Sequence, residues 1–158
     1  MPTPEDFMRR AIEIARQKML DDGAAPFGCV IVKDGKIVGE GVNNVVAKCD
    51  PTSHGEVEAI RDAGRKLGTW DLSGCELYTS CEPCELCVAA MFWAKIDRMY
   101  YAATLADCED IGFDLSRLRE LVRNDIPRRP MRAEQILHPE ARAVIDEWTA
   151  SPSFSTFQ

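Results

Sequence analysis

The sequence predicts an α/β protein, a three-layer α/β/α sandwich built around one mixed five-stranded sheet. The first observation is the order of the elements: a helix and two strands are followed by alternating helices and strands. The second is the hairpin signal Asp34-Gly35, which makes the first two strands antiparallel. The third is the composition, since 46% hydrophobic and 28% charged residues in a chain of 158 are typical of a globular domain with a real core.

The N-terminal helix has both of its ends marked in the sequence. Thr3 is a capping residue, Pro4 fits the first turn, and Asp6 lies three residues after the cap. Gly23 ends the helix. The stretch FGCVIVKDGKIVGEG, residues 27–41, then predicts the two strands of the hairpin.

The rest of the chain alternates between helices and strands after a polar loop over 43–53. The predicted elements are a helix from near Ser53, a strand over 75–80, a helix from Pro83 to about Lys95, a strand over 98–103, a helical segment within 114–123, a last strand over 131–137 and a helix from Pro139 to about Thr149. We expect residues 1–158 to form a single domain, with a tail over 150–158 that is mobile or exchanged between subunits.

Charge and hydropathy exclude several classes of protein. The net charge of −7 and the pI of about 4.9 disfavour a nucleic-acid partner, because an acidic surface repels phosphate. The start MPTPEDFMRR has no apolar core of a signal peptide, and no apolar run reaches the ~18 residues of a membrane span. We therefore expect a cytoplasmic protein with no membrane partner.

The seven cysteines argue against a disulfide framework, because their number is odd and the chain carries no export signal. Four of them are scattered, and we expect these to be small buried hydrophobes or surface thiols: Cys29, Cys49, Cys75 and Cys108.

The other three cysteines lie in CEPCELC, residues 81–87. A disulfide, a structural zinc finger and a catalytic metal site all use cysteines this close. With Pro83 in the first turn of a helix, Cys84 and Cys87 share one side of its N-terminus, where the helix dipole favours the thiolate form that binds metal. Cys81 precedes the proline and is expected to be a neighbour of the site, not a ligand.

A catalytic zinc site fits the remaining ligands better than a structural one. A structural site takes four protein ligands, but the chain has no second C-x-x-C and no H-x₃₋₅-H. A catalytic site takes three and leaves the fourth position to water. His54, at the start of a predicted helix in SHGEVEAI, is the natural third ligand. Glu56 lies two residues on, across Gly55, and its carboxylate can take and return protons beside a metal-bound water.

Together these residues make the pattern H-x-E…P-C-x-x-C, a signature of zinc-dependent nucleobase deaminases. Over nearly its whole length the sequence resembles the cytidine/deoxycytidylate deaminase superfamily. Within it, the stretches PFGCVIVKDG, GVNNV, DPTSHGEVEAIR, LYTSCEPCELC and YAAT…GFD are most similar to bacterial guanine deaminase.

The resemblance implies one zinc ion per chain on His54, Cys84 and Cys87, with Glu56 as the catalytic proton shuttle. It implies hydrolytic deamination of a free purine base, guanine first, to give xanthine and ammonia. It also implies a homodimer that binds a small nucleobase.

The substrate contacts that the resemblance implies are Phe27, Asn43, Gly55, Trp93 and Asp114. Phe27 would stack on the base, Asn43 would bind the ring through its amide, Trp93 would line the pocket, and Asp114 in GFD would assist proton traffic. All but Gly55 have a purely structural alternative: a core phenylalanine, a loop cap, a helix-core tryptophan and a helix-capping aspartate.

Departures from the family pattern leave other substrates open. The chain reads His-Gly-Glu, as fungal cytosine deaminases also do; Leu115 stands where relatives can have a second acid; and the tail SPSFSTFQ has no tyrosine to close the pocket, leaving Phe154 or Phe157 for that role. Guanosine and cytosine are the nearest alternatives. A tRNA adenosine substrate is disfavoured, because Arg142 is the only basic side chain over 139–158. The non-enzyme alternative is a zinc-stabilised binding module, which would have no use for Glu56.

Overall fold

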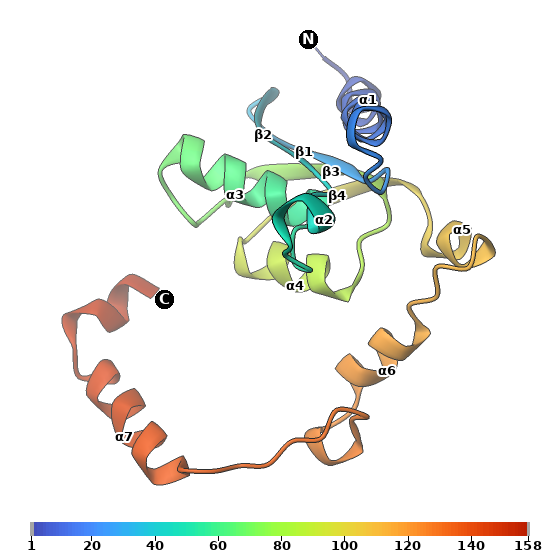
Figure 1. Cartoon of the computed structure of the whole chain (residues 1–158). Coiled ribbons are helices and arrows are strands. Elements are labelled where there is room, and N and C mark those ends of the chain that lie inside the picture. Colours follow the sequence, from blue (N-terminus) through green and yellow to red (C-terminus); the bar gives the residue numbers. More distant parts are fainter. Residues whose placement is uncertain (1, 158) are drawn as a thin grey trace. The chain divides into compact units, whose positions relative to one another are not determined.

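The structure is a computed structural model that describes residues 2–157, except for the side chains of 155–157 (Figure 1). The strands are β1 (Gly28–Lys33), β2 (Lys36–Val42), β3 (Cys75–Cys81) and β4 (Arg98–Ala103). The α-helices are α1 (Pro4–Asp22), α2 (Val45–Lys48), α3 (Gly55–Leu67), α4 (Glu85–Trp93), α5 (Leu105–Asp110), α6 (Ser116–Arg123) and α7 (His138–Thr149), and the 3₁₀ helices are η1 (Ile126–Arg128) and η2 (Pro152–Phe157).

The sheet is mixed, as predicted, with the strand order β2-β1-β3-β4. β1 pairs antiparallel with both β2 and β3, and β3 pairs parallel with β4 through the crossover that contains α4. The β1–β2 hairpin turns at Asp34 and Gly35, whose φ angles of 51° and 71° are those of a type I′ turn. The predicted start and end of α1 are confirmed by a Thr3–Asp6 capping box and a left-handed Gly23.

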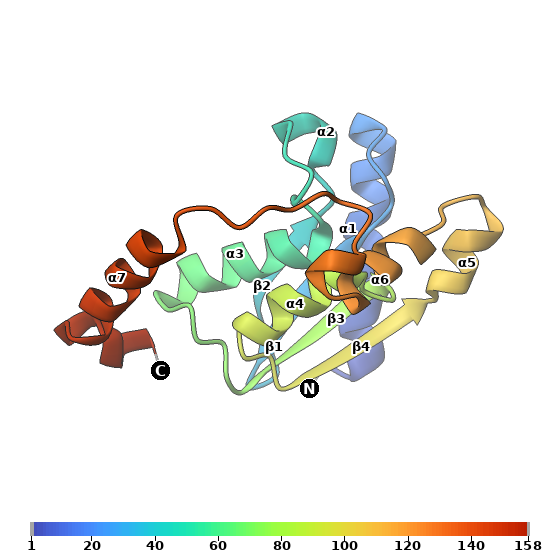
Figure 2. The same ribbon diagram turned by 90° about the horizontal axis from the view of Figure 1, so that it is seen from below.

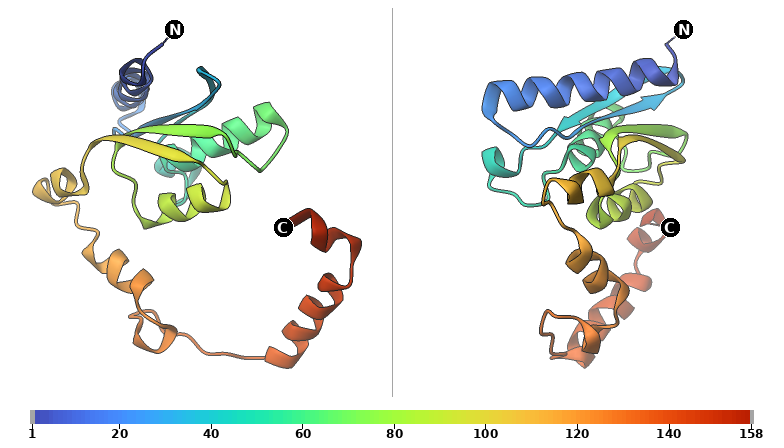
Figure 3. Two further views of the ribbon diagram at one scale, coloured as in Figure 1. Left: turned by 180° about the vertical axis from the view of Figure 1, so that it is seen from behind. Right: turned by 90° about the vertical axis from the view of Figure 1, so that its right-hand side faces the viewer.

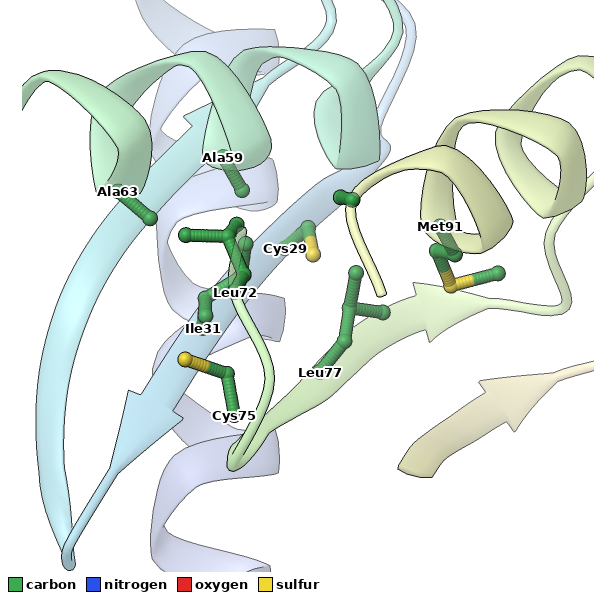
Figure 4. Packing of buried hydrophobic residues seen from close by; sticks show 9 residues of the cluster. Cys29, Ile31, Ala59, Ala63, Leu72, Cys75, Leu77 and Met91 are labelled. Carbon is green, nitrogen blue, oxygen red and sulfur yellow. The ribbon is translucent and has the colours of Figure 1, made fainter. Parts of the chain in front are cut away.

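Helices cover both faces of the sheet, which gives the three predicted layers (Figure 3). The side chains of successive residues in β1 point to opposite faces of the sheet. Cys29 and Ile31 pack with Ala59 and Met91 under α3 and α4 (Figure 4). On the other face the core beside α1 consists of Phe7, Ala11, Val30, Val32 and Tyr78.

Small residues let β2 lie directly against α3. A Cβ atom at Gly41 would lie 2.2 Å from the backbone nitrogen of Ala59 and 2.2 Å from the carbonyl oxygen of Gly55. No side chain larger than hydrogen fits between the strand and the helix at this point. The start of α3, which carries the predicted metal ligand and proton shuttle, is therefore held tightly on the sheet.

The sheet has four strands, so the predicted fifth strand is wrong. Residues 131–137 are irregular, and Leu137 has a left-handed φ of 54° at the N-cap of α7. A strand forms only where its backbone groups pair with a neighbour. The segment lies in the part of the chain over 120–157, in which the structure has helices and turns but no strand.

The chain divides into two compact units, residues 1–119 and 120–158, with the boundary inside α6. The first contains the sheet and the predicted site. In the second, η2 folds back on α7, and the rings of Trp148 and Phe154 meet edge to face with centroids 5.0 Å apart. The predicted tail over 150–158 is thus partly helical; Gln158 and the side chain of Phe157 lie outside the described part. No helix over 2–157 has the length and apolarity to cross a membrane.

Candidate metal centre and active site

The predicted metal ligands stand at the starts of two neighbouring helices on one face of the sheet (Figure 2). His54 is the N-cap of α3, and Cys84 is the N-cap of α4, both with extended backbone angles. Cys87 lies three residues further on, in the first turn of α4. The helix begins after Pro83 and not at it, which corrects the predicted start. N-cap side chains reach over the helix end, where the unpaired N–H groups favour an anion such as a thiolate.

The three ligand atoms already have the spacing that zinc requires. The Nδ1 atom of His54 lies 3.5 Å from the Sγ atoms of Cys84 and Cys87, and the two sulfurs are 3.7 Å apart. With the usual Zn–S and Zn–N lengths, a tetrahedral ion has S–S and S–N edges of about 3.8 and about 3.6 Å. Within the described residues this is the one cluster of three donors close enough to hold a metal ion. The donor set and its dimensions fit one zinc ion with a position left for a further ligand.

The protein environment prepares these groups for a cation. The hydrogen bond between the sulfurs of Cys84 and Cys87, with a further contribution from His54 and against the effect of burial, lowers the pKa of Cys84 to about 4. That hydrogen bond and burial raise the pKa of Cys87 well above its ordinary range. The contact with Cys84 raises the pKa of His54. Zinc uptake therefore displaces protons, above all the one on Cys87.

Glu56 reaches the same point from the second residue of α3. It is only 6% exposed. Its Oε1 accepts a hydrogen bond of 2.9 Å from the hydroxyl of Thr79 on β3, and its Oε2 lies 3.2 Å from the Sγ of Cys87. Because one oxygen is fixed by Thr79, the other is held beside the ligand cluster, where it can accept a proton.

Cys81 does not belong to the ligand cluster. Its Sγ atom lies 3.4 Å from the Sγ of Cys108 on α5 and 3.8 Å from the carbonyl oxygen of Thr104. Burial and the contact with Cys108 raise its pKa to about 12, so it stays a neutral thiol. All seven cysteines are free; Cys29, Cys75 and Cys108 are buried and Cys49 is exposed.

Three of the predicted substrate contacts meet at the start of α3. The backbone N–H of Asn43 donates to the carbonyl oxygen of Phe27 at 2.9 Å. A Cβ atom at Gly55 would lie 2.9 Å from this same oxygen, so glycine allows the close approach of the three segments. Among the described residues, the side-chain amide nitrogen of Asn43 donates no hydrogen bond, while its Oδ1 accepts weakly from Val45 at 3.4 Å. Its two amide hydrogens are available to a ligand.

Of the other two predicted contacts, Trp93 stands at the far end of α4. Asp114 lies between Phe113, which contacts Phe27, and Leu115, which packs against the cluster of Cys84 and Cys87. Trp93 is the last residue of α4, about 12 Å along the helix from its start. It is 66% exposed, and its ring meets that of Phe92 edge to face. Asp114 accepts hydrogen bonds from the backbone N–H and the hydroxyl of Ser116, which lower its pKa. Its carboxylate thus binds the residue that begins α6.

Sequence reasoning missed Thr79 and Phe113 at the site, and it named Leu115 only as a departure from the family pattern. Thr79 orients Glu56, and a buried polar residue in a strand is the signal that could have found it. Phe113 contacts Phe27, with ring centroids 6.4 Å apart. Leu115 packs against the apolar cluster around Cys84 and Cys87, which explains an apolar side chain in that position.

A cavity of about 440 Å³ lies elsewhere, at the N-terminal ends of β3 and β4, lined by residues that include Val32, Asp34, Glu76, Asp97 and Arg98. The ligand cluster follows the C-terminal end of β3, and ligands of α/β sheets bind at the C-terminal ends of strands. The cluster, not this cavity, is the candidate active site.

Comparisons with known proteins agree with this site. Residues 1–103 match the family model described as the cytidine and deoxycytidylate deaminase zinc-binding region. The guanine deaminase of Bacillus subtilis is 40% identical over 144 residues, covering 91% of this chain and 92% of that protein. The crystal structure of guanine deaminase from Bacillus subtilis superposes with a TM-score of 0.90 at 39% identity, over 95% of this chain and 96% of the other. A tRNA-specific adenosine deaminase of Aquifex aeolicus is 38% identical, but over 63% of this chain and 65% of its own length.

Proposed function

We propose that this chain, which belongs to the cytidine and deoxycytidylate deaminase family and is a zinc-dependent deaminase, hydrolyses free guanine to xanthine and ammonia. The observation that supports guanine as the substrate is the extent of the likeness to the guanine deaminase of Bacillus subtilis. It runs through both compact units of the chain, whereas the metal motif alone would be common to every deaminase of the family. Family membership also removes the alternative of a zinc-stabilised binding module.

The chemistry divides between the metal and Glu56. When bound by His54, Cys84 and Cys87, zinc supplies a water molecule acidified enough to attack near neutral pH. Glu56 accepts the proton of that water at the oxygen that Thr79 leaves unbound. It delivers this proton to the ring nitrogen as the water oxygen bonds to the ring carbon. Glu56 then takes the remaining proton of the added hydroxyl and gives it to the amino group, so that the carbon–nitrogen bond breaks and ammonia leaves. Burial keeps bulk water from competing for these protons.

The substrate pocket that we propose is centred on the point where the backbones of Phe27, Asn43 and Gly55 approach each other closely. The unbound amide hydrogens of Asn43 support a hydrogen bond to a ring acceptor, and the rings of Phe27 and Phe113 supply an apolar wall. A site built around such a donor discriminates against a base that leaves it unpaired. For the homodimer, and not for the single chain, we propose that Asp114 carries protons and that Trp93 forms a wall of the pocket.

That assembly is, in our proposal, a homodimer in which the C-terminal segment is exchanged. Two observations support it. β4 is an edge strand that pairs only with β3 among the described residues. Large apolar side chains stand exposed on α4: Val88, Phe92 and Trp93. A second copy of the chain offers both an edge and an apolar face.

The test is ammonia release by zinc-loaded protein from guanine, guanosine, cytosine, adenine and tRNA, compared as kcat/KM. Guanine should be preferred. A clear preference for cytosine or a nucleoside would replace the substrate and leave the zinc chemistry in place. A preference for tRNA would contradict both the acidic charge and the basic-poor C-terminal segment. Sedimentation of the same sample tests the dimer separately.

A further inference from the structure

Helix α3 carries a second buried carboxylate that the reaction does not use. Glu58 is 7% exposed, almost as buried as Glu56. Two residues along a helix correspond to about 200° of rotation, so the two side chains point to opposite sides of α3. Glu56 faces the metal ligands, and Glu58 faces the loop that joins β2 to α3.

Glu58 is the acceptor for three donors. Its Oε1 accepts from the hydroxyl of Ser53 at 2.6 Å and from the guanidinium of Arg61 at 2.6 Å, and its Oε2 accepts from the ammonium of Lys48 at 2.5 Å. Ser53 is fully buried, so its hydroxyl cannot turn to water instead. Lys48 and Ser53 both lie in the loop, and Glu58 therefore ties two points of the loop to the helix.

Arg61, one turn further along α3, extends the same contact. Its guanidinium donates to the Thr52 hydroxyl at 3.3 Å and lies 3.5 Å from the carboxylate of Asp50. The Asp50 carboxylate in turn accepts from the backbone N–H and hydroxyl of Thr52. Arg61 thus holds the loop at Asp50 and Thr52, and Glu58 holds it at Lys48 and Ser53.

The loop matters because its two ends are functional. One end begins beside Asn43, the proposed substrate contact, and the other leads directly into His54, the metal ligand. A backbone hydrogen bond of 2.9 Å from Asn44 to the carbonyl oxygen of Ser53 closes the loop at its base. A shift of Ser53 is therefore transmitted to both residues.

We propose that Glu58, supported by Arg61, is a positioning residue of the active site. It fixes the loop over 44–53 so that Asn43 and His54 keep the spacing that substrate and metal require. A carboxylate suits this role, because it can accept two cationic donors and a hydroxyl at once, whereas an amide places a donor of its own against them. The part of this inference that concerns Asn43 rests on the proposed function.

The test compares zinc-loaded Glu58→Gln with Asp62→Asn. Asp62 lies one turn beyond Glu58 on the same helix, is partly buried and pairs with Lys66 and Arg65. Its remaining contact is the backbone N–H of Glu40 on β2 and not the loop. We expect Glu58→Gln to speed amide hydrogen exchange over 44–53 about tenfold or more, the scale of one lost charge-assisted hydrogen bond. Asp62→Asn should leave exchange of the loop unchanged.

Kinetics provide the second readout. Glu58→Gln should raise KM about tenfold with a smaller change in kcat, because the loop positions a binding group and Glu56 is untouched. General destabilisation would instead lower the active fraction and leave KM alone. Should Glu58→Gln not accumulate as folded protein, Ser53→Ala makes the same comparison with a smaller change. When Ser53→Ala is combined with Glu58→Gln, amide hydrogen exchange of the loop should be no faster than in Glu58→Gln alone, because both changes remove the same contact.

Failure of the inference and failure of the proposed function give different results. The exchange experiment needs no substrate, and the kinetic one is run on whichever base the substrate panel selects. Loop exchange and KM that match those of Asp62→Asn would overturn the positioning role, whatever base is deaminated. Fast loop exchange in an enzyme that prefers another base would keep the role and change the substrate.

Discussion

The Nδ1 atom of His54 lies 3.5 Å from the Sγ atom of Cys84, although the two residues are 30 positions apart and cap two different helices. The crossover from α3 through β3 to α4 returns the chain to the same end of the sheet. Both helix starts then point at one place, where their N-terminal dipoles favour the negative charge of a thiolate.

Cys84→Ala should lose zinc, and Cys81→Ala should keep it. Cys84 supplies one of three protein ligands, whereas the sulfur of Cys81 faces Cys108. Zinc content per chain after dialysis measures the difference. Zinc retained by the first variant and lost by the second would refute the ligand assignment.

Glu56→Gln should keep zinc and fold but lower kcat by ~10²–10⁴-fold, the usual contribution of a general acid–base group. Its amide can still accept from Thr79 but cannot carry a proton. Steady-state rates and zinc content are measured together. The matched control is Glu76→Gln, in which a glutamate near the other end of β3 loses only the charge that accepts from Tyr78. Near-normal turnover by Glu56→Gln would exclude the mechanism.

Gly41→Ala should destabilise the protein by about 1–3 kcal/mol or more, the usual cost of overpacking. The added Cβ would meet backbone atoms of α3 at 2.2 Å, and the helix start would have to leave the sheet. Gly35→Ala is the control, because it meets nothing within 4 Å and adds only the strain of a positive φ. Urea midpoints compare the two. Equal decreases in the urea midpoint would show that β2 and α3 can move apart to accommodate the added methyl group.

The Glu58 contacts should stabilise the protein in a pH-dependent way. Burial tends to raise the pKa of Glu58, but hydrogen bonds from Lys48, Ser53 and Arg61 prevail and lower it from 4.5 to about 2. A depressed pKa means that the stabilisation is present above about pH 4.5 and is lost as the pH falls toward 2.

Urea midpoints of wild type and Glu58→Gln measure this stabilisation. The difference between the two proteins should be largest near pH 6 and should shrink below pH 4.5. Zinc release at low pH affects both proteins, so the comparison uses only their difference. A difference that is constant from pH 6 to pH 3 would mean that the charge of Glu58 contributes nothing.

The sequence by itself determined the features that depend on local backbone geometry and ligand chemistry. The Thr3 cap, the Asp34-Gly35 turn and the start of a helix near Ser53 follow from residues within a few positions of each other. The ligand set could be chosen because few residue types bind zinc and the chain has only two histidines.

Only the tertiary structure decided which distant side chains share a buried space. Thr79 beside Glu56, Phe113 beside Phe27 and Ser53 beside Glu58 are pairs that no local pattern predicts, because each depends on how strands and helices pack. The fifth strand failed for the same reason. The sequence over 131–137 resembles a strand, but a strand exists only where another strand accepts its hydrogen bonds, and that partner is a property of the whole fold.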